Sequence, residues 1–294
     1  MKKITALILI ALALFLLVSC NDDNSDSDNV DATTDITGLT TASPSEPRPE
    51  TVTIGDVEYS TDLTELDLSW LTDDEIEPLK YMTNLTSLSL YNNEITNMNV
   101  LSGLIDLTEL SMRGNFSISD ISGLSGLTNL TELYMGRNGD ISDIGPLRGL
   151  TNLTHLNLWE GCLISDISPL SGMTNLVLLN LGRNAISDLR PLSELTNLTT
   201  LFLGTNQIND ISVLSELSNL TDLDLSENQI SDISALSGLS SLALLYLSDN
   251  QISNISALSG LTNLTYLGLH RNPISEADRQ ALRAALPNCE IIFD

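Results

Sequence analysis

The feature that most constrains the fold of this chain is a repeat of 22 or 23 residues that runs through most of its length. Residues 220–241 read LTDLDLSENQISDISALSGLSS, and the next 22 residues begin LALLYLSDNQISNISALSGLTN. Chains with a repeat of this period form stacked coils, because one copy alone cannot bury its own apolar side chains. The sequence therefore predicts an elongated stack of ten coils over residues 63–274. The coils begin at Leu63, Leu85, Leu107, Leu130, Leu153, Leu176, Leu198, Leu220, Leu242 and Leu264.

The first half of each copy predicts a short strand that ends in an asparagine. In the eighth copy, Leu223 and Leu225 alternate with Asp222 and Asp224, so the leucines point inward and the aspartates outward. Strands of successive coils would then stack into one parallel sheet. The amide of Asn228 can both donate to and accept from backbone groups where the chain leaves the strand. The equivalent residues predict a buried asparagine ladder: Asn93, Asn115, Asn138, Asn184, Asn206, Asn250 and Asn272.

The second half of each copy, such as ISDISALSGLSS, is too short for a full helix and two turns, and it predicts a 3₁₀ or irregular turn. Pro146, Pro169 and Pro191 suit the start of such a turn. One acidic residue precedes the turn in six copies: Asp120, Asp143, Asp166, Asp188, Asp210 and Asp232. This column could cap the turns or hold a stack of calcium ions. Capping is the favoured interpretation, because calcium needs six to eight oxygens and because Asn97 and Asn254 occupy the same place.

The segments that flank the repeats predict caps for the two ends of the stack. Residues 51–62 alternate weakly and predict a short strand or hairpin as the N-terminal cap. Residues 275–294 predict a C-terminal cap, with Ser275 at the start of a helix from about Glu276 to Leu286 and Ala281, Leu282, Ala285 and Leu286 on one face. Pro287 would end that helix, and a last strand from Cys289 to Phe293 would close the stack.

The N-terminus predicts export and attachment to a membrane. Two lysines precede an apolar run over residues 4–18, and the run ends in Leu17-Val18-Ser19-Cys20. This ending resembles the lipobox of bacterial lipoproteins, which implies a signal peptide over residues 1–19 and a lipid anchor on Cys20. The alternative is an ordinary signal peptide with a cysteine at its end by chance. Residues 20–50 are rich in Asp, Ser, Thr and Pro and predict a disordered acidic tether.

The repeats resemble a known family. The pattern LxxLxLxxNxI is the signature of leucine-rich repeats, and the phrase ISDISPLSGMTNL at residues 164–176 is similar to the internalin-type subfamily of bacterial leucine-rich repeat proteins. The resemblance implies an α/β solenoid: a right-handed superhelix with a concave parallel sheet and a convex side of 3₁₀ or irregular turns. It also implies a cell-surface protein that binds a protein partner with its concave face.

Outward places on the predicted strands carry most of the aromatic side chains, which dominate the energetics of protein interfaces. Two rival interpretations stay open: an envelope spacer without a specific ligand, and a glycan-binding or enzyme-associated subunit. The predicted partner-binding residues are Tyr91, Tyr134, His155, Trp159, Arg183, Phe202, Tyr246 and Tyr266.

Composition excludes several other classes of function. The formal net charge of −27 disfavours binding to nucleic acid. The two histidines, His155 and His270, lie five copies apart, or about 24 Å, so no metal site, cofactor or enzymatic activity is expected. Cys162 and Cys289 are similarly far apart and cannot form a disulfide within one chain. We expect a monomer.

Overall fold

The computed structural model describes residues 48–139, 141–160 and 163–294. The predicted signal peptide, Cys20, nearly all of the predicted tether and Cys162 lie outside the described residues. The described residues pack as one compact unit. Within the described ranges, no helix has the length and apolar character that crossing a membrane requires.

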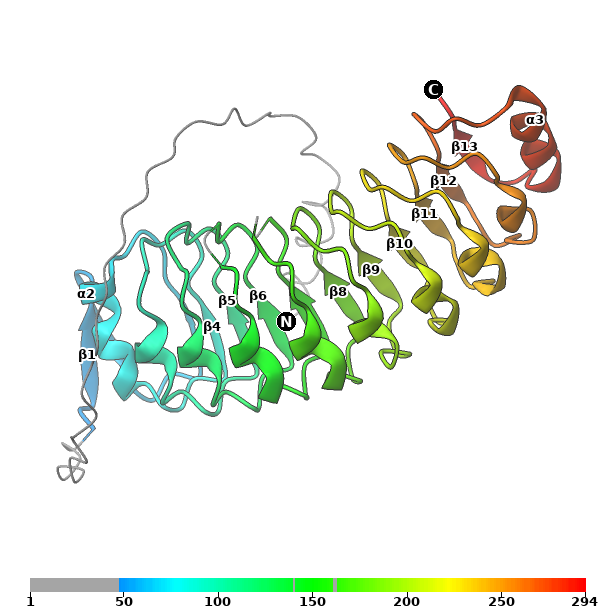
Figure 1. Cartoon of the computed structure of the whole chain (residues 1–294). Helices are drawn as coiled ribbons and strands as arrows, with labels where there is room; N and C mark the ends of the chain where they lie inside the picture. The colour runs from blue at the N-terminus through cyan, green and yellow to red at the C-terminus, as the bar shows by residue number, and fades with distance from the viewer. Residues whose placement is uncertain (1–47, 140, 161–162) are drawn as a thin grey trace, which may run out of the picture. The chain divides into compact units, whose positions relative to one another are not determined.

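The main feature of this unit is a parallel sheet of 11 strands in sequence order, with one strand from each coil and one more at the C-terminal end (Figure 1). Neighbouring strands pair without any shift in register, so Leu201, Leu223 and Leu245 lie side by side. The repeat of 22 or 23 residues accounts for this register, because equivalent residues of successive coils lie opposite one another in the sheet. The strands are β3 (Glu65–Asp67), β4 (Ser87–Ser89), β5 (Glu109–Ser111), β6 (Glu132–Tyr134), β7 (His155–Asn157), β8 (Leu178–Asn180), β9 (Thr200–Phe202), β10 (Asp222–Asp224), β11 (Leu244–Tyr246), β12 (Tyr266–Gly268) and β13 (Glu290–Ile292).

The opposite side of the coils consists of short helical turns (Figure 1). The first coil has the α-helix α2 (Asp73–Ile76) followed by the 3₁₀ helix η1 (Glu77–Tyr81). The later coils have 3₁₀ turns alone, and the three prolines named above lie in the first turn of η4, η5 and η6, as predicted. The 3₁₀ turns are η2 (Met98–Leu101), η3 (Ser122–Leu124), η4 (Gly145–Gly149), η5 (Ser168–Gly172), η6 (Arg190–Leu192), η7 (Ser212–Glu216), η8 (Ser234–Gly238) and η9 (Ser256–Leu258).

The core lies between the sheet and the 3₁₀ turns and continues from coil to coil. Its side chains come from seven apolar places in each repeat, and all seven are buried in the eighth coil. Each fully buried leucine or isoleucine contributes about 1.5–3 kcal/mol of transfer free energy. The solenoid predicted from the period is therefore confirmed. The seven residues of the eighth coil are Leu220, Leu223, Leu225, Ile230, Ile233, Leu236 and Leu239.

Separate elements cover the two ends of this core. An antiparallel hairpin of β1 (Thr51–Ile54) and β2 (Val57–Ser60) precedes the first coil. The helix α3 (Glu276–Ala285) follows the last coil, and the hydroxyl of Ser275 accepts a hydrogen bond from the N–H of Asp278 at 3.2 Å. Only Leu282 and Leu286 of its predicted apolar face are buried, whereas Ala281 and Ala285 are exposed. The helix therefore buries the two leucines of this face and leaves its two alanines at the surface.

Candidate functional site

The asparagine ladder fixes the path of the chain where it leaves each strand. In the ninth coil, Nδ2 of Asn250 donates to the carbonyls of Leu225, Leu247 and Ser248 at 2.9, 3.1 and 3.2 Å. Its Oδ1 accepts a hydrogen bond from the N–H of Ile230 at 2.9 Å. One buried amide thus satisfies four backbone groups of two coils, which matters because unpaired buried polar groups are costly. The edge of the sheet beside this ladder is therefore rigidly held.

The residue before each ladder asparagine adopts a left-handed backbone conformation. Its N–H donates to a carbonyl of the next coil, as from Arg183 to Gly204 at 2.8 Å and from Arg137 to Trp159 at 2.9 Å. We call this line of residues the rim of the sheet. Sequence reasoning missed it, because bulky and β-branched residues, which normally avoid positive φ, stand there. The non-glycine rim residues, with φ between 52° and 65°, are Trp70, Asn92, Arg137, Glu160, Arg183, Thr205, Glu227, Asp249 and Arg271.

The ladder is disturbed around the fifth coil. The sequence has Gly161, which lies outside the described residues, where the neighbouring coils have asparagine. On either side of it, Nδ2 of Asn138 and Oδ1 of Asn184 are buried without a hydrogen-bond partner. Coils three to five are also the copies with an extra residue. The hydrogen bonds of the ladder are therefore incomplete at Asn138 and Asn184.

Trp159, in this same fifth coil, lies at the centre of a cluster of charged side chains. The guanidinium carbons of Arg137 and Arg183, from the two flanking coils, lie 5.3 and 5.9 Å from the centroid of its ring. Nε of Arg137 also donates to the carboxylate of Glu160 at 2.9 Å. We call Arg137, Trp159, Glu160 and Arg183 the Trp159 cluster. Contacts of this kind contribute about 0.5–2 kcal/mol each, depending on how far the pair is desolvated.

The side chain of Trp159 is half-buried. The ring lies against Gly182 of the next coil, where an added Cβ would come within 3.0 Å of the ring atom Cδ1. Because Gly182 has no side chain, the ring of Trp159 can pack against it. Gly136 of the preceding coil is also buried, and an added Cβ there would come within 3.2 Å of the backbone carbonyl of Trp159.

Two more predicted residues, Tyr134 and His155, lie on β6 and β7, the strands that precede Arg137 and Trp159. The hydroxyl of Tyr134 donates to the carboxylate of Glu132 at 2.7 Å. Burial, and then this hydrogen bond to Glu132, raise the pKa of Tyr134 above its usual value. His155 pairs in register with Glu132 and Leu178, and its Nδ1 lies 2.9 Å from the hydroxyl of Thr154. Of the predicted residues, Arg183 is thus the one that contacts the Trp159 ring, whereas Tyr134 and His155 contact their own neighbours on the strands.

The other predicted residues lie elsewhere along the sheet. The rings of Tyr246 and Tyr266 are 5.0 Å apart, centroid to centroid, in coils nine and ten. Phe202 is separated from Tyr246 by Asp224, which pairs with both in the sheet. Tyr91 lies near the N-terminal end and is 45% exposed. Within the predicted set, the observed ring contacts are thus two pairs, Trp159 with Arg183 and Tyr246 with Tyr266.

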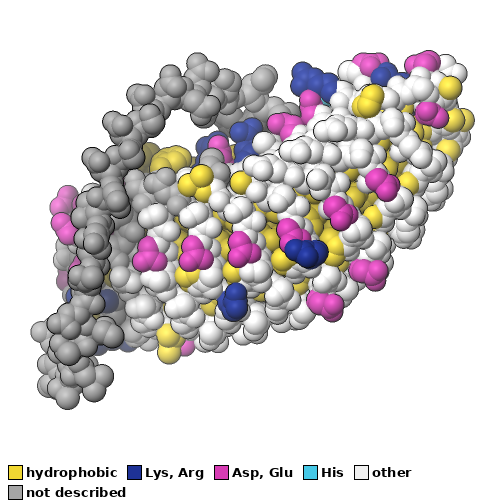
Figure 2. Space-filling view, in the orientation of Figure 1, with side chains coloured by type: hydrophobic (Ala, Val, Ile, Leu, Met, Phe, Trp, Pro, Cys, Tyr) yellow, Lys and Arg dark blue, Asp and Glu magenta, His cyan; other side chains and the backbone are white. Residues whose placement is uncertain are grey.

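The acidic column on the opposite side caps the 3₁₀ turns. The carboxylate of Asp210 accepts the N–H of Ser212 at 2.9 Å, and that of Asp232 accepts the N–H of Ser234 at 2.8 Å. Backbone N–H groups, foremost among the causes, lower the pKa of both aspartates, and hydrogen bonds from Arg190 lower the pKa of Asp188 to about 2. Figure 2 shows acidic side chains recurring from coil to coil across the face in view. The capping interpretation agrees with these contacts, which occur at all six aspartates and at Asn97 and Asn254.

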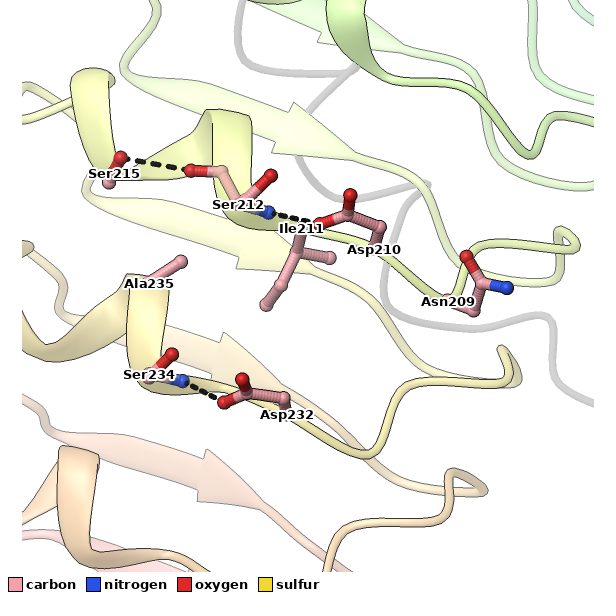
Figure 3. A pocket seen from close by; sticks show the side chains of 8 residues that line it. All are labelled: Asn209, Asp210, Ile211, Ser212, Ser215, Asp232, Ser234 and Ala235. Carbon is pink, nitrogen blue, oxygen red and sulfur yellow. Dashed lines mark hydrogen bonds between the residues drawn. The ribbon is translucent and has the colours of Figure 1, made fainter.

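A shallow groove of about 390 Å³ lies between two of these turns, η7 and η8 (Figure 3). Both carboxylates that line it are directed to backbone N–H groups of their own turns. Among the described residues, no group of three His, Cys, Asp or Glu side chains could hold a metal ion together. The groove is lined by Asn209, Asp210, Ile211, Ser212, Ser215, Asp232, Ser234 and Ala235.

Comparisons with known proteins agree with this geometry. Family models described as leucine-rich repeats match residues 83–126, 128–172, 174–216, 216–237 and 231–274. A search of curated proteins gives no match.

Solved structures of internalins are similar to this chain over most of its length. An internalin (inlF) of Listeria monocytogenes is 31% identical with a TM-score of 0.67, over 81% of this chain and 83% of that one. Internalin C2 of the same organism is 32% identical with a TM-score of 0.52, over 74% and 85%. The ectodomain of the Arabidopsis thaliana receptor kinase GASSHO1/SCHENGEN3 shares the fold alone, at 21% identity and a TM-score of 0.65, over 79% of this chain and 30% of that one. With its repeats, its asparagine ladder and its parallel sheet, this chain belongs to the leucine-rich repeat family and is of the internalin-like kind.

Proposed function

We propose that this protein is a lipid-anchored binding module, displayed at the cell surface, that recognises a protein partner through the concave sheet face. The observation that carries the proposal is the Trp159 cluster. Tryptophan and arginine are the residue types most enriched among interface hot spots, which lie near the centre of an interface. Here both types occur together at the middle of the array.

The packing of the cluster also supports a binding role. The Trp159 ring packs against Gly182 of the next coil and contacts the guanidinium groups of Arg137 and Arg183 from the two flanking coils. Because these contacts already restrict the ring, little side-chain entropy is lost when a partner covers it. Neutral side chains, Asn157 and Asn180, lie next to it on the same face. The arrangement offers a rigid aromatic surface with polar groups around it, which is the usual composition of a protein-recognition site.

The experiment that tests this function is capture of a partner by residues 21–294, immobilised without the signal peptide. Trp159→Ala should weaken binding of the captured partner by about 2 kcal/mol or more, as for a hot spot. It should lower the free energy of unfolding by about 1 kcal/mol, because the ring is half-buried. Asp232→Ala, on the opposite side of the coils, is the matched control and should leave binding unchanged.

Two outcomes would contradict the proposal. Failure of the wild-type chain to capture any protein would favour a spacer without a specific ligand. Loss of binding in Asp232→Ala, with normal binding in Trp159→Ala, would place the working surface on the side of the 3₁₀ turns.

A further inference from the structure

Arg183 differs from Arg137 and Arg271, the two other arginines of the rim, in the use of its guanidinium. Arg137 donates to Glu160 at 2.9 Å, and Arg271, at the same rim place in the tenth coil, donates to Asp249 at 3.0 Å. The guanidinium of Arg183 donates no hydrogen bond to any residue in the described part of the chain. It stacks on the face of the Trp159 ring instead. Its donor groups are therefore free for a ligand.

The structure also restricts where this guanidinium can lie. The backbone of Arg183 has a φ of 56° and is held by its N–H···O bond to Gly204 at 2.8 Å. Stacking on the half-buried ring of Trp159 then limits the far end of the side chain. A cation fixed in this way loses little entropy on binding, and a guanidinium fork fits the two oxygens of a carboxylate.

The charges around Arg183 favour an anionic ligand at this place on an otherwise acidic protein. The chain has 39 acidic and only 12 Lys and Arg residues. Arg113, Arg137 and Arg183 nevertheless follow the strands of coils three, four and six, with Glu160 as the acidic residue of the rim between them. The strands that carry the nearest acidic residues are β6, with Glu132, and β10, with Asp222 and Asp224, and each lies two coils away from the coil of Arg183.

We propose that Arg183, supported by Trp159, is the docking point for an aspartate or glutamate side chain of the protein partner. The carboxylate would accept two parallel hydrogen bonds from the guanidinium, while an adjacent apolar side chain would cover the Trp159 ring. This inference rests on the proposed function, and it narrows the partner to one that presents an acidic side chain beside an apolar one.

A peptide titration tests the inference directly. The protein carries Trp70→Phe, so that Trp159 is its single tryptophan, and the probe is the capped peptide Gly-Ser-Glu-Phe-Glu-Ser-Gly. Trp159 fluorescence and the Nε–H NMR signal of Arg183 should both respond to this peptide. A peptide with both Glu residues replaced by Gln should bind the wild-type protein about tenfold more weakly. The acidic peptide should likewise bind Arg183→Gln about tenfold more weakly than it binds the wild type. Arg183→Lys should also bind weakly, because an ammonium cannot form the paired hydrogen bonds.

Arg271→Gln is the matched control, because Arg271 has the same backbone conformation but is already paired with Asp249. It should leave peptide binding unchanged. Equal binding of the Glu and Gln peptides, or of the wild type and Arg183→Gln, would overturn the inference. So would a sulfated disaccharide that binds through Arg183 when the acidic peptide does not, since this would assign the site to a glycan.

Binding of the captured partner to the variants distinguishes failure of this inference from failure of the proposed function. If Trp159→Ala weakens capture and Arg183→Gln does not, carboxylate docking is wrong while protein recognition by the sheet face stands. If the acidic peptide binds through Arg183 and no protein is ever captured, the docking chemistry stands and the proposed function is wrong.

Discussion

The carboxylate of Asp224 accepts two hydrogen bonds from Ser226, one from the backbone N–H at 2.9 Å and one from the hydroxyl at 2.6 Å. Burial nevertheless raises the pKa of Asp224, so the fold disfavours the charged form despite these bonds. At the same place in other coils, Asn157 and Asn180 accept the equivalent N–H bond without a charge, at 3.0 and 3.1 Å.

Asp224→Asn should therefore stabilise the protein at pH 7, by on the order of 0.5–1 kcal/mol. A carboxyl whose pKa is raised on folding destabilises the fold when it is ionised, and this effect disappears as the pH falls below its unfolded value near 3.8. Urea unfolding of the variant and the wild type at pH 7 and at pH 3.5 measures the difference in their free energies of unfolding. This difference should be smaller at pH 3.5. Asp232→Asn is the control: its pKa is lowered on folding, so it should give no gain at pH 7.

Asn228→Ala should destabilise the protein by roughly 2–4 kcal/mol, because it leaves several buried backbone groups without partners. Nδ2 of Asn228 donates to the carbonyls of Leu203, Leu225 and Ser226, and Oδ1 accepts the N–H of Ile208. Asn219→Ala removes an exposed amide whose Nδ2 donates to the carbonyl of Thr196, and it should cost less than about 1 kcal/mol. Denaturant unfolding of the two variants compares them, and equal costs would show that the ladder adds nothing special.

Leu223→Asp should open the coils around it before the rest of the stack. Leu223 is fully buried, so the substitution places an unpaired carboxylate in the core at a cost of several kcal/mol. Because each coil contacts mainly its neighbours, amide hydrogen exchange should accelerate most in coils seven to nine. Leu244→Asp, on the outward face of the next strand, is the control and should change exchange little. Uniform acceleration along the chain would instead indicate a single cooperative unit.

Cys20→Ala should abolish lipid attachment in a bacterium that expresses the whole chain. The reason is the Leu-Val-Ser-Cys ending of the apolar run, which places the thiol at the predicted cleavage point. Labelled fatty acid should appear in the wild type and be absent from the variant. Cys289→Ala, which changes a half-buried thiol at the other end of the chain, should be labelled normally. Fatty acid in the Cys20→Ala protein would show that the anchor lies elsewhere.

The period of the sequence was sufficient to predict the fold. Leucines at fixed spacing predicted which side of each strand is buried, and Leu201, Leu223 and Leu245 lie in register as that spacing requires. The ladder and the capping aspartates were equally predictable, since Asn250 and Asp232 bind backbone groups of their own or the preceding coil. Such contacts depend on local geometry that the repeat fixes.

The Trp159 cluster could be predicted only in part. Alternation along the strand placed Trp159 outward and Arg183 on a neighbouring coil, but Arg137 was not recognised as the second arginine beside the ring. Its position depends on the left-handed rim, for which residues such as arginine and glutamate give no signal. The burial of Trp159 was also missed, because it depends on Gly182 of the following coil.

The left-handed rim has a consequence for how this protein can evolve. Hydrogen bonds between coils already hold the rim backbone, as at Arg183 and Arg137. A side chain there costs about 1–2 kcal/mol of steric strain, and replacement by glycine would relieve it but lose roughly 0.5–1 kcal/mol of chain entropy. Exchange of one rim residue for another therefore changes stability little while it changes which groups meet a partner. New specificities can arise there by single substitutions, without compensating changes in the core.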